Sequence, residues 1–301
     1  MPPLVSIITV NYNGTALLLE MLAALERCTY PEKEIIVVDN ASEEDPSPVL
    51  RARHPAVKVL RSERNLGFAG ANNLGLREAR GTFFFLLNND AWPEPSALST
   101  LVRFLETHPD AGAVSPLICF PAEEGQETRV QFAGATDLNL LTARNRTLGR
   151  DRRPDQLPPH PHPIPFAHGA AMLVPRRVVE AVGPLSEDFF LYYEELDWCA
   201  RMRKAGWTIY LEPRAQVFHH ESHSIGAGSP LKCFWQTRNR LLFARKHFPS
   251  WAKPLVWSYF LGVALPVNLF RHRKSADHRK AFLRGVAAHL QPGKWEPLYT
   301  P

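Results

Sequence analysis

Short apolar runs alternate with amphipathic stretches through the first 110 residues of the chain. Each run is bounded by polar residues, which predicts a buried strand. The stretches between the runs place apolar residues at helical spacing. The expected strands are residues 4–10, 34–39, 57–62 and 82–88, and the expected helices are residues 15–28, 47–54, 69–80 and 95–109. This alternation predicts an α/β fold with a doubly wound, mostly parallel sheet flanked by helices.

The pattern changes twice in the rest of the chain. Between about residues 121 and 165 the sequence is polar and rich in proline, and we expect irregular loop structure there. Helical patterning is clear at residues 194–206, where acidic residues come first and basic residues last. We therefore expect an α/β domain over residues 1–227, with two parts that meet near residue 120, and a C-terminal helical extension over residues 228–301.

The apolar segment 254–270 suits contact with a membrane surface. It is interrupted by Pro266 and Asn268, and its length is at the short limit for a bilayer span. Trp251 precedes it and the basic run 271–280 follows it, as in helices that lie in the headgroup region. We expect a peripheral membrane contact. Packing against the α/β domain and a membrane span are the two alternatives.

Composition and charge are those of an ordinary globular protein. Hydrophobic residues make up 45% and charged residues 22% of the chain, so a large core can form. The formal net charge of +5 is modest and gives no reason to expect a nucleic-acid partner. The concentration of charge in residues 271–280 suits either an anionic partner or a solvated helix face.

Cysteine usage and the first residues favour a cytoplasmic protein. The four cysteines are far apart and form no CxxC pair, which favours reduced, buried thiols over disulfides or a zinc site. The chain begins without a basic region, so the apolar run 4–10 predicts a first strand rather than a signal peptide. The expected location is the cytoplasm, at the inner face of the cell membrane if the apolar segment lies at an interface. The cysteines are Cys28, Cys119, Cys199 and Cys233.

Two of the expected strands lead into an aspartate. Asp39 ends one of them, and Asp90 follows the apolar run 83–87 after Asn88 and Asn89. Open α/β sheets bind ligands at the carboxyl ends of their strands, so both carboxylates are candidate ligand-binding groups. The alternative for Asp39 is a helix cap or a turn residue.

Further ionisable residues lie in the second half of the chain. Glu194, Glu195 and Asp197 open the expected helix, where they suit either chemistry or simple compensation of the helix dipole. His219 and His220 follow a short strand-like run. Beside a carboxylate and a diphosphate such a histidine would be a metal ligand; alone it would be structural or solvated.

The glycine pattern excludes two common schemes of nucleotide binding. The first expected strand is followed by "NYNGTALL", which is not the GxGxxG of a dinucleotide-binding fold. Gly67, Gly70 and Gly75 match neither that spacing nor a phosphate-binding loop. Any nucleotide must therefore be held in another way.

Six segments resemble, in order, the family 2 glycosyltransferases, which are inverting enzymes with the GT-A fold, and especially their rhamnosyltransferase-like members. Together they cover most of residues 4–225, and "QTRNRLLFARKHFP" also resembles the segment that follows this domain in such enzymes. The six segments are "VSIITVNYNG", "IIVVDNAS", "RNLGFAGANNLGL", "FLLNNDAWPEP", "GAAMLVPRRVVEAVGPLSEDFFLYYEELDWCARMRKAGW" and "AQVFHHESHS".

The resemblance implies a donor site at the strand ends. Asp39 would contact the base or ribose of a nucleotide-sugar, beside the backbone around Val10 and Tyr12. Asn65 and Asn73 would help to seat the nucleotide.

The resemblance also implies a metal site. Asp90 would hold Mn²⁺ or Mg²⁺ between the two phosphates of the donor, and His219 would complete the site. Asn88 stands where the first aspartate of the family's metal motif is usual, so one anionic ligand is missing.

The implied catalytic base is Glu195. Aspartate is commoner at this position, and the extra methylene of glutamate moves the carboxylate by about one C–C bond, which matters because small misplacements are costly. Asp197 is the second candidate for the base, and Asn89 and Glu194 are further substrate-binding candidates.

The implied reaction moves a sugar from a nucleoside-diphosphate sugar, dTDP-rhamnose or a UDP-sugar, to a hydroxyl of a glycan or lipid-linked acceptor in polysaccharide biosynthesis. Two other functions stay open. A nucleotide-sugar-binding subunit without turnover would not release nucleoside diphosphate. A sugar nucleotidyltransferase would be expected to have a basic triphosphate loop where "NYNGTALL" stands.

Overall fold

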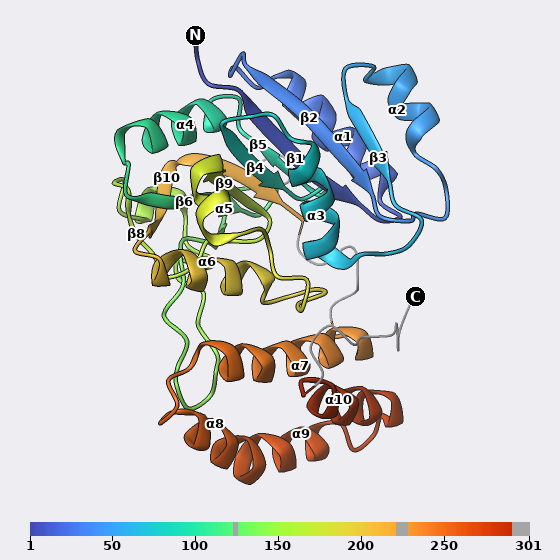
Figure 1. Ribbon diagram of the computed structural model, residues 1–301, viewed down its shortest axis with the longest axis vertical. Coiled ribbons are helices and arrows are strands. Elements are labelled where there is room, and N and C mark those ends of the chain that lie inside the picture. Colours follow the sequence, from blue (N-terminus) through green and yellow to red (C-terminus); the bar gives the residue numbers. More distant parts are fainter. Residues whose placement is uncertain (123–125, 221–227, 291–301) are drawn as a thin grey trace.

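The computed structural model describes residues 1–122, 126–220 and 228–290. A twisted sheet with helices on its faces forms the upper part of the molecule, and helices α7 to α10 form a layer of their own below it (Figure 1). The expected boundary at residue 227 belongs to the segment 221–227, which lies outside the described residues.

The sheet has the strand order β3-β2-β1-β4-β9-β6-β10-β5, with β7 beside β6 and β8 beside β10. Pairing is parallel through β3, β2, β1 and β4 and between β6 and β10, whereas β9, β5, β7 and β8 run antiparallel to their neighbours. The strands are β1 (Val5–Asn11), β2 (Lys33–Asp39), β3 (Lys58–Arg61), β4 (Phe83–Leu87), β5 (Ala91–Pro93), β6 (Ala111–Cys119), β7 (Val130–Phe132), β8 (His162–Pro163), β9 (Ala171–Pro175) and β10 (Thr208–His219).

The helices follow the expected alternation up to α4, which confirms an α/β sheet flanked by helices. The α-helices are α1 (Thr15–Glu26), α2 (Ser47–Arg53), α3 (Gly67–Glu78), α4 (Ala97–Thr107), α5 (Arg176–Val182), α6 (Glu194–Lys204), α7 (Pro230–His247), α8 (Lys253–Tyr259), α9 (Leu265–Arg271) and α10 (Ala276–Ala288). Two short elements are the 3-10 turn η1 (Pro154–Gln156) and the π-helical turn η2 (Phe260–Ala264).

Parallel register places the polar strand ends side by side. In the pairing of β1 with β2, Val10 lies opposite Val38 and Asn11 lies opposite Asp39. All five residues of β4, the next strand along, are buried, as its apolar run predicts. The residues that follow β1, β2 and β4 therefore meet at one edge of the sheet, because parallel strands end in the same direction.

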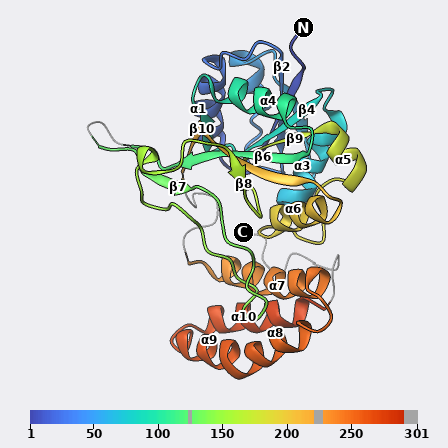
Figure 2. The ribbon, with the colours of Figure 1, turned by 90° about the vertical axis from the view of Figure 1, so that its left-hand side faces the viewer.

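The expected loop region between residues 121 and 165 contains only short elements. A long hairpin-like excursion runs from the sheet down to the helical layer, as both ribbon views show (Figures 1 and 2). At its tip the Nε of Arg240 in α7 donates to the Thr142 carbonyl at 2.7 Å.

The C-terminal helices form a small core of their own. Leu241 of α7, Phe260 and Ala264 of η2, and Phe282 of α10 are buried together. The apolar segment predicted from sequence is a helical rod from α8 to α9 with a π-helical turn just before Pro266. Proline lacks the N–H that an α-helix would use, so a local change of hydrogen bonding at this point has a physical cause. Within the described residues, no helix combines the length and apolar character needed to cross a bilayer.

Close packing of α3 on the sheet depends on Gly75. An added Cβ would lie 2.5 Å from Cγ2 of Ile8 and 3.3 Å from Cγ2 of Val38. Overpacking of this kind typically costs ~1–3 kcal/mol, which exceeds or offsets the ~1 kcal/mol that alanine gains over glycine in a helix. We expect Gly75→Ala to lower the free energy of unfolding, measured by urea denaturation.

Gly262 in η2 provides the matched control for Gly75. No described atom outside its local helix lies within 4 Å of a Cβ built there, so Gly262→Ala should leave stability unchanged or raise it. Equal stabilisation by both substitutions would contradict this account of α3 packing.

Candidate functional site

Asn11 connects three strand ends at the carboxyl edge of the sheet. Its Nδ2 donates to Oδ1 of Asp39 at 3.1 Å and lies 3.2 Å from Oγ of Ser42, while its Oδ1 accepts from Nδ2 of Asn89 at 3.1 Å. Asn11 and Asp39 are fully buried. The sequence analysis did not select Asn11, although a polar residue directly after the apolar run 4–10 was a usable signal.

The carboxylate of Asp39 is partly neutralised by its neighbours. Oδ2 accepts from the backbone N of Ser42 at 3.3 Å and lies 3.6 Å from Nε of the half-exposed Arg61. Val10 and Tyr12 flank Asn11 at the end of β1, and both are half-buried. The predicted donor-contacting residues Val10, Tyr12 and Asp39 therefore lie together at this edge.

Asn65 shapes the turn that leads into α3. Its Oδ1 accepts from Nδ2 of Asn40 at 2.9 Å and from the backbone N of Gly67 at 2.9 Å. Gly67 has a left-handed φ of 71°, and an added Cβ would lie 2.4 Å from Phe190, so both the backbone and the close approach require glycine.

Asn73 is engaged with a loop from a distant part of the chain. Its amide donates to the carbonyl of Leu185 and to Oε1 of Glu187, both at 2.9 Å, and accepts from the backbone N of Leu185 at 3.1 Å. Both amide hydrogens and the amide oxygen are thus used within the protein. In this structure Asn73 therefore organises the loop before α6.

Asp90 and His219 lie side by side because β5 pairs with the end of β10. The pairing sets Ala91 opposite His219, and the backbone N of His220 donates to the carbonyl of Asp90 at 3.0 Å. Oδ1 of Asp90 lies 3.3 Å from Nε2 of His219, and both side chains are buried. The pair is not a hydrogen bond, and Oδ1 has no hydrogen-bond partner among the described residues.

Gln131 fixes the orientation of the His219 ring. Its Nε2 lies 3.5 Å from the carbonyl of His219, which leaves its Oε1 to accept from Nδ1–H of the ring at 2.7 Å. In the neutral ring the other nitrogen, Nε2, then carries the lone pair, and it faces the Asp90 carboxylate. Nothing in the sequence pointed to Gln131, because it stands in a three-residue strand inside the proline-rich region.

Two acceptors that face each other in a buried site suit a cation between them. His168, whose ring lies 5.8 Å from that of His219, does not supply positive charge, because burial lowers its pKa to about 3. Across residues 1–122, 126–220 and 228–290, no three His, Cys, Asp or Glu side chains form a metal-binding group. Asp90 and His219 thus offer two ligands, the number that suits an ion held chiefly by substrate phosphates.

Asn88 and Asn89 form the turn between β4 and Asp90. Asn88 is half-buried, and its backbone N donates to the carbonyl of Ala170 at 2.9 Å. The rest of the histidine-containing segment, residues 221–224, lies outside the described residues.

Glu194 and Glu195 begin α6 behind a strained turn. Tyr192 and Tyr193 have φ values of 68° and 74°, a conformation that costs residues other than glycine about 1–3 kcal/mol each. One oxygen of each glutamate, Oε2, is buried without a hydrogen-bond partner in the described part of the chain. Burial raises the pKa of Glu195, and burial together with the charge of Glu195 raises the pKa of Glu194 well above its usual range.

Asp197 takes part in an ion-pair network. Its carboxylate accepts from Nε of Arg201 at 2.8 Å and from Nε2 of His247 at 2.7 Å, with Nζ of Lys246 3.7 Å away. Burial alone would raise its pKa, but the hydrogen bond from His247 and the charge of Arg201 hold the pKa below its ordinary value. A carboxylate so neutralised is a weak proton acceptor, which favours Glu195 over Asp197 as a base.

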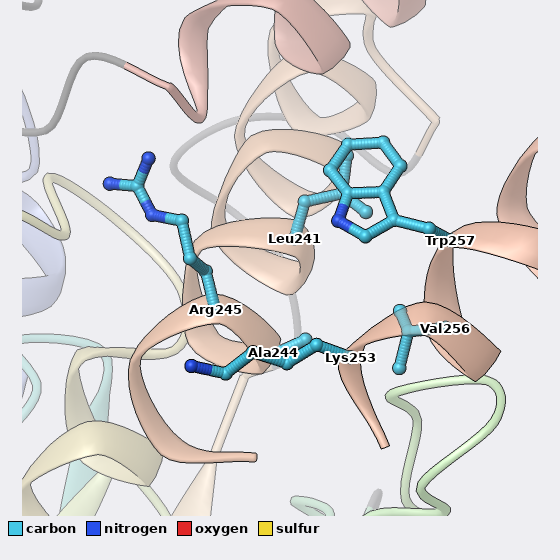
Figure 3. Close-up of a pocket in the computed structure, with 6 residues that line it drawn as sticks. All are labelled: Leu241, Ala244, Arg245, Lys253, Val256 and Trp257. Carbon is cyan, nitrogen blue, oxygen red and sulfur yellow. The ribbon is translucent and has the colours of Figure 1, made fainter. Parts of the chain in front are cut away.

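A hollow in the helical layer is too small to be the donor site. It lies between α7 and α8 and has a volume of about 30 Å³ (Figure 3). Small-molecule sites are typically ~300–1,000 Å³. Its lining residues, none of them a candidate site residue, are Leu241, Ala244, Arg245, Lys253, Val256 and Trp257.

Comparison with known proteins agrees with the family resemblance of the sequence. Residues 6–183 match the model of the glycosyl transferase family 2. Over 95% of its length the chain is 26% identical to 99% of a Mycobacterium tuberculosis protein named N-acetylglucosaminyl-diphospho-decaprenol L-rhamnosyltransferase.

Two solved structures share the fold. The mannosyltransferase PcManGT of Pyrobaculum calidifontis, in complex with GDP-Man and Mn²⁺, superposes with a TM-score of 0.60 at 17% identity, over 98% of this chain and 89% of that one. S. aureus TarS 1-349 in complex with UDP-GlcNAc gives a TM-score of 0.59 at 15% identity, over 96% of this chain and 81% of that one. With the family match over more than half of its length and the GT-A fold of these neighbours, the chain belongs to glycosyl transferase family 2 and is a glycosyltransferase.

Proposed function

We propose that the protein is an inverting, metal-dependent glycosyltransferase that moves a sugar, rhamnose by preference, from a nucleoside-diphosphate sugar to a hydroxyl of a glycan or lipid-linked acceptor. The observation that carries this proposal is the buried Asp90–His219 pair, in which two acceptors face each other at 3.3 Å. The name of the mycobacterial relative supports rhamnose and a polyprenyl-linked acceptor, and the ligands of the solved neighbours support a nucleotide-sugar donor.

Asp90 and His219 would hold Mn²⁺ or Mg²⁺. The imidazole ligand favours Mn²⁺ over Mg²⁺, which prefers oxygen. When bound, the ion would stabilise the negative charge that develops on the departing diphosphate. Gln131 keeps Nε2 of His219 available for this role by accepting a hydrogen bond from Nδ1–H. Asn88, a neutral residue, would add at most a weak oxygen ligand.

Asp39 would hold the nucleoside. Its buried carboxylate lies at the strand edge with Arg61 3.6 Å away and can accept from a base N–H or a ribose hydroxyl. Asn11 fixes one carboxylate oxygen, and the backbone of Val10 and Tyr12 borders the same edge. Asn89 is tied to Asn11 and would position the turn that carries Asp90.

Glu195 would take the proton of the acceptor hydroxyl as the glycosidic bond forms. Its raised pKa suits a base, because a more basic carboxylate is a better proton acceptor near neutral pH. A single base on the face opposite the diphosphate gives one displacement with inversion. Glu194, whose pKa is raised further, would be protonated beside it and able to donate a hydrogen bond to substrate.

We also propose that the C-terminal helices contact the inner face of the cell membrane. Several large apolar side chains of the rod from α8 to α9 and the turn before it are exposed, and Arg271, Arg273 and Lys274 follow at its end. Apolar burial near the headgroups would be reinforced by about 1 kcal/mol for each basic residue at an anionic surface. The exposed apolar residues are Trp251, Leu255, Leu261, Val263, Val267 and Phe270.

Metal dependence is tested by substitution of the two proposed ligands. Asp90→Ala should remove nearly all transfer, and His219→Ala should raise the Mn²⁺ concentration that gives half-maximal rate. Asp137→Ala, at a mostly exposed aspartate that pairs with Arg203 at the surface, is the control and should transfer sugar as wild type does. Full activity of the wild-type protein in excess EDTA would overturn the metal site.

The base is tested by Glu195→Gln, which keeps the shape of the side chain but cannot accept a proton. We expect turnover to fall by ~10²–10⁴ while donor affinity, from nucleotide-sugar titration, stays near that of wild type. In wild type the rate should rise with pH through the pKa of Glu195, which lies above the ordinary 4.5 because the group is buried.

Asp197→Asn serves as the counterpart to Glu195→Gln. It should lower the thermal midpoint, because Arg201 and His247 lose a charged partner, yet retain measurable turnover. An active Glu195→Gln together with a folded, inactive Asp197→Asn would assign the base to Asp197. Absence of nucleoside diphosphate release from wild type with any donor and acceptor would favour a binding subunit.

Membrane contact is tested by co-sedimentation with liposomes that contain anionic phospholipid. Wild type should sediment with them, less so at high salt, and a variant with Leu261→Ser and Phe270→Ser should stay in solution. Leu148→Ser, at an exposed leucine outside the helical layer, is the matched control. Equal sedimentation of all three proteins would contradict the proposal.

A further inference from the structure

Helix α7 carries two fully buried polar residues that touch the loop before the proposed base. Arg238 and Asn239 are each 0% exposed, although α7 belongs to the helical layer below the sheet. Both side chains point at backbone carbonyls of the loop 188–192, which leads directly into Glu194 and Glu195.

Asn239 holds the two carbonyls that precede the left-handed residues. Its Nδ2 donates to the carbonyls of Leu191 and Tyr192, both at 2.8 Å, and its Oδ1 accepts from Nη1 of Arg238 at 2.6 Å. Tyr192 and Tyr193 are the residues with φ of 68° and 74°. A strained turn persists only where its surroundings fix it, and Asn239 supplies two of the bonds that fix this one.

The burial of the Arg238 guanidinium is unfavourable for the stability of the fold. Nη1 donates to the carbonyl of Asp188 at 2.8 Å, but Nε and Nη2 are buried with no hydrogen-bond partner in the described ranges. Desolvation is the first cause of its lowered pKa, which falls to about 10. Apolar residues often replace such buried charges without loss of stability, so its presence is better explained by control of the loop than by stability.

The opposite side of the same loop is hydrogen-bonded to α3. The backbone N of Phe68 in α3 donates to the carbonyl of Phe190 at 2.7 Å, and Asn73 binds Leu185 and Glu187. The ring of Phe190 also stacks on Trp235 of α7, with centroids 4.8 Å apart. The loop is therefore hydrogen-bonded to α3 on one side and to α7 on the other.

We propose that Arg238 and Asn239 are positioning residues, which hold the left-handed Tyr192–Tyr193 turn and so aim the carboxylate of Glu195 at the acceptor hydroxyl. The inference rests on the proposed function, in which Glu195 is the base. It adds that the helical layer acts on the proposed base through this loop.

The test compares Asn239→Leu with a matched asparagine in the same layer. Asn239→Leu keeps the size of the side chain and removes both donors. Asn268→Leu on α9 is the control, because the amide of Asn268 donates to the carbonyl of Ala264, one turn earlier in the same helical rod, and to no loop in the described contacts. Arg238→Met is the second variant and should fold even if Asn239→Leu does not.

Three measurements separate positioning from a general loss of structure. Hydrogen exchange of the amides of residues 186–193 should become faster in Asn239→Leu and Arg238→Met, but not in Asn268→Leu. Turnover should fall by about 10²-fold, because small misplacements of a catalytic group are costly, while donor affinity is unchanged. The acid limb of the pH–rate profile should move to lower pH as water reaches Glu195 and its pKa falls.

That pH shift has few competing origins. Glu194, Tyr192, Tyr193 and Cys199, which interact electrostatically with Glu195, are unchanged in both variants, as are Arg144 and Arg240 beside Tyr193. Asn239→Leu changes no charge. Arg238→Met removes a cation, and the loss of a nearby cation would raise the pKa of a carboxyl, which is opposite to the expected shift. A loss of folded protein alone would lower the rate at every pH without a shift of the limb.

The inference is overturned if both variants keep wild-type exchange over residues 186–193, or if turnover falls only as far as the folded fraction does. Its failure differs from failure of the proposed function. If wild-type protein transfers no sugar, the exchange experiment still reports whether α7 holds the loop, whereas an active enzyme with unaltered variants would refute the positioning role alone.

Discussion

The active-site arrangement depends on one constraint, which is that parallel strands end at the same edge of the sheet. Because β1, β2 and β4 are parallel neighbours, polar residues at the ends of three apolar runs come within hydrogen-bonding distance of Asn11. Asn11 joins them, and the turn after β4 then carries Asp90 toward His219 on β10. Buried polar groups in such a place are held by each other, so the edge is already shaped before a ligand arrives.

Much of this edge could be predicted from the sequence because the signal is local. An apolar run that leads into an aspartate predicts both the strand and a carboxylate near its end, as at Asp39, which ends β2, and at Asp90, which follows β4 after two asparagines. His219 needed the family resemblance as well, since its role depends on β5 turning back to pair with β10. The pairing of β9 between β4 and β6 was not predictable from alternation, because an antiparallel strand inserted late in the chain leaves no local pattern.

The residues that the sequence analysis missed are those whose contacts lie far away along the chain. Gln131 lies in a short strand with no periodicity, and Asn239 lies in a helix whose apolar pattern gives no hint of a partner loop. Asp197 shows the opposite case: its place beside Glu195 made it a candidate base, and only the contacts with Arg201 and His247 reveal a structural commitment. Side-chain partners far apart along the chain are set by packing, which no local pattern encodes.

The hydrogen bonds of one loop with both α3 and α7 affect how the molecule unfolds. The segment 185–193 contributes backbone hydrogen bonds to both layers, and His247 of α7 adds a bond to Asp197 of α6. Separation of the two layers would break buried hydrogen bonds in both. We therefore expect the sheet and the helices to unfold in a single cooperative transition rather than as two independent domains. We therefore expect a motion that loosens α7 to disturb the loop that leads into Glu194 and Glu195 earlier than the core of the sheet.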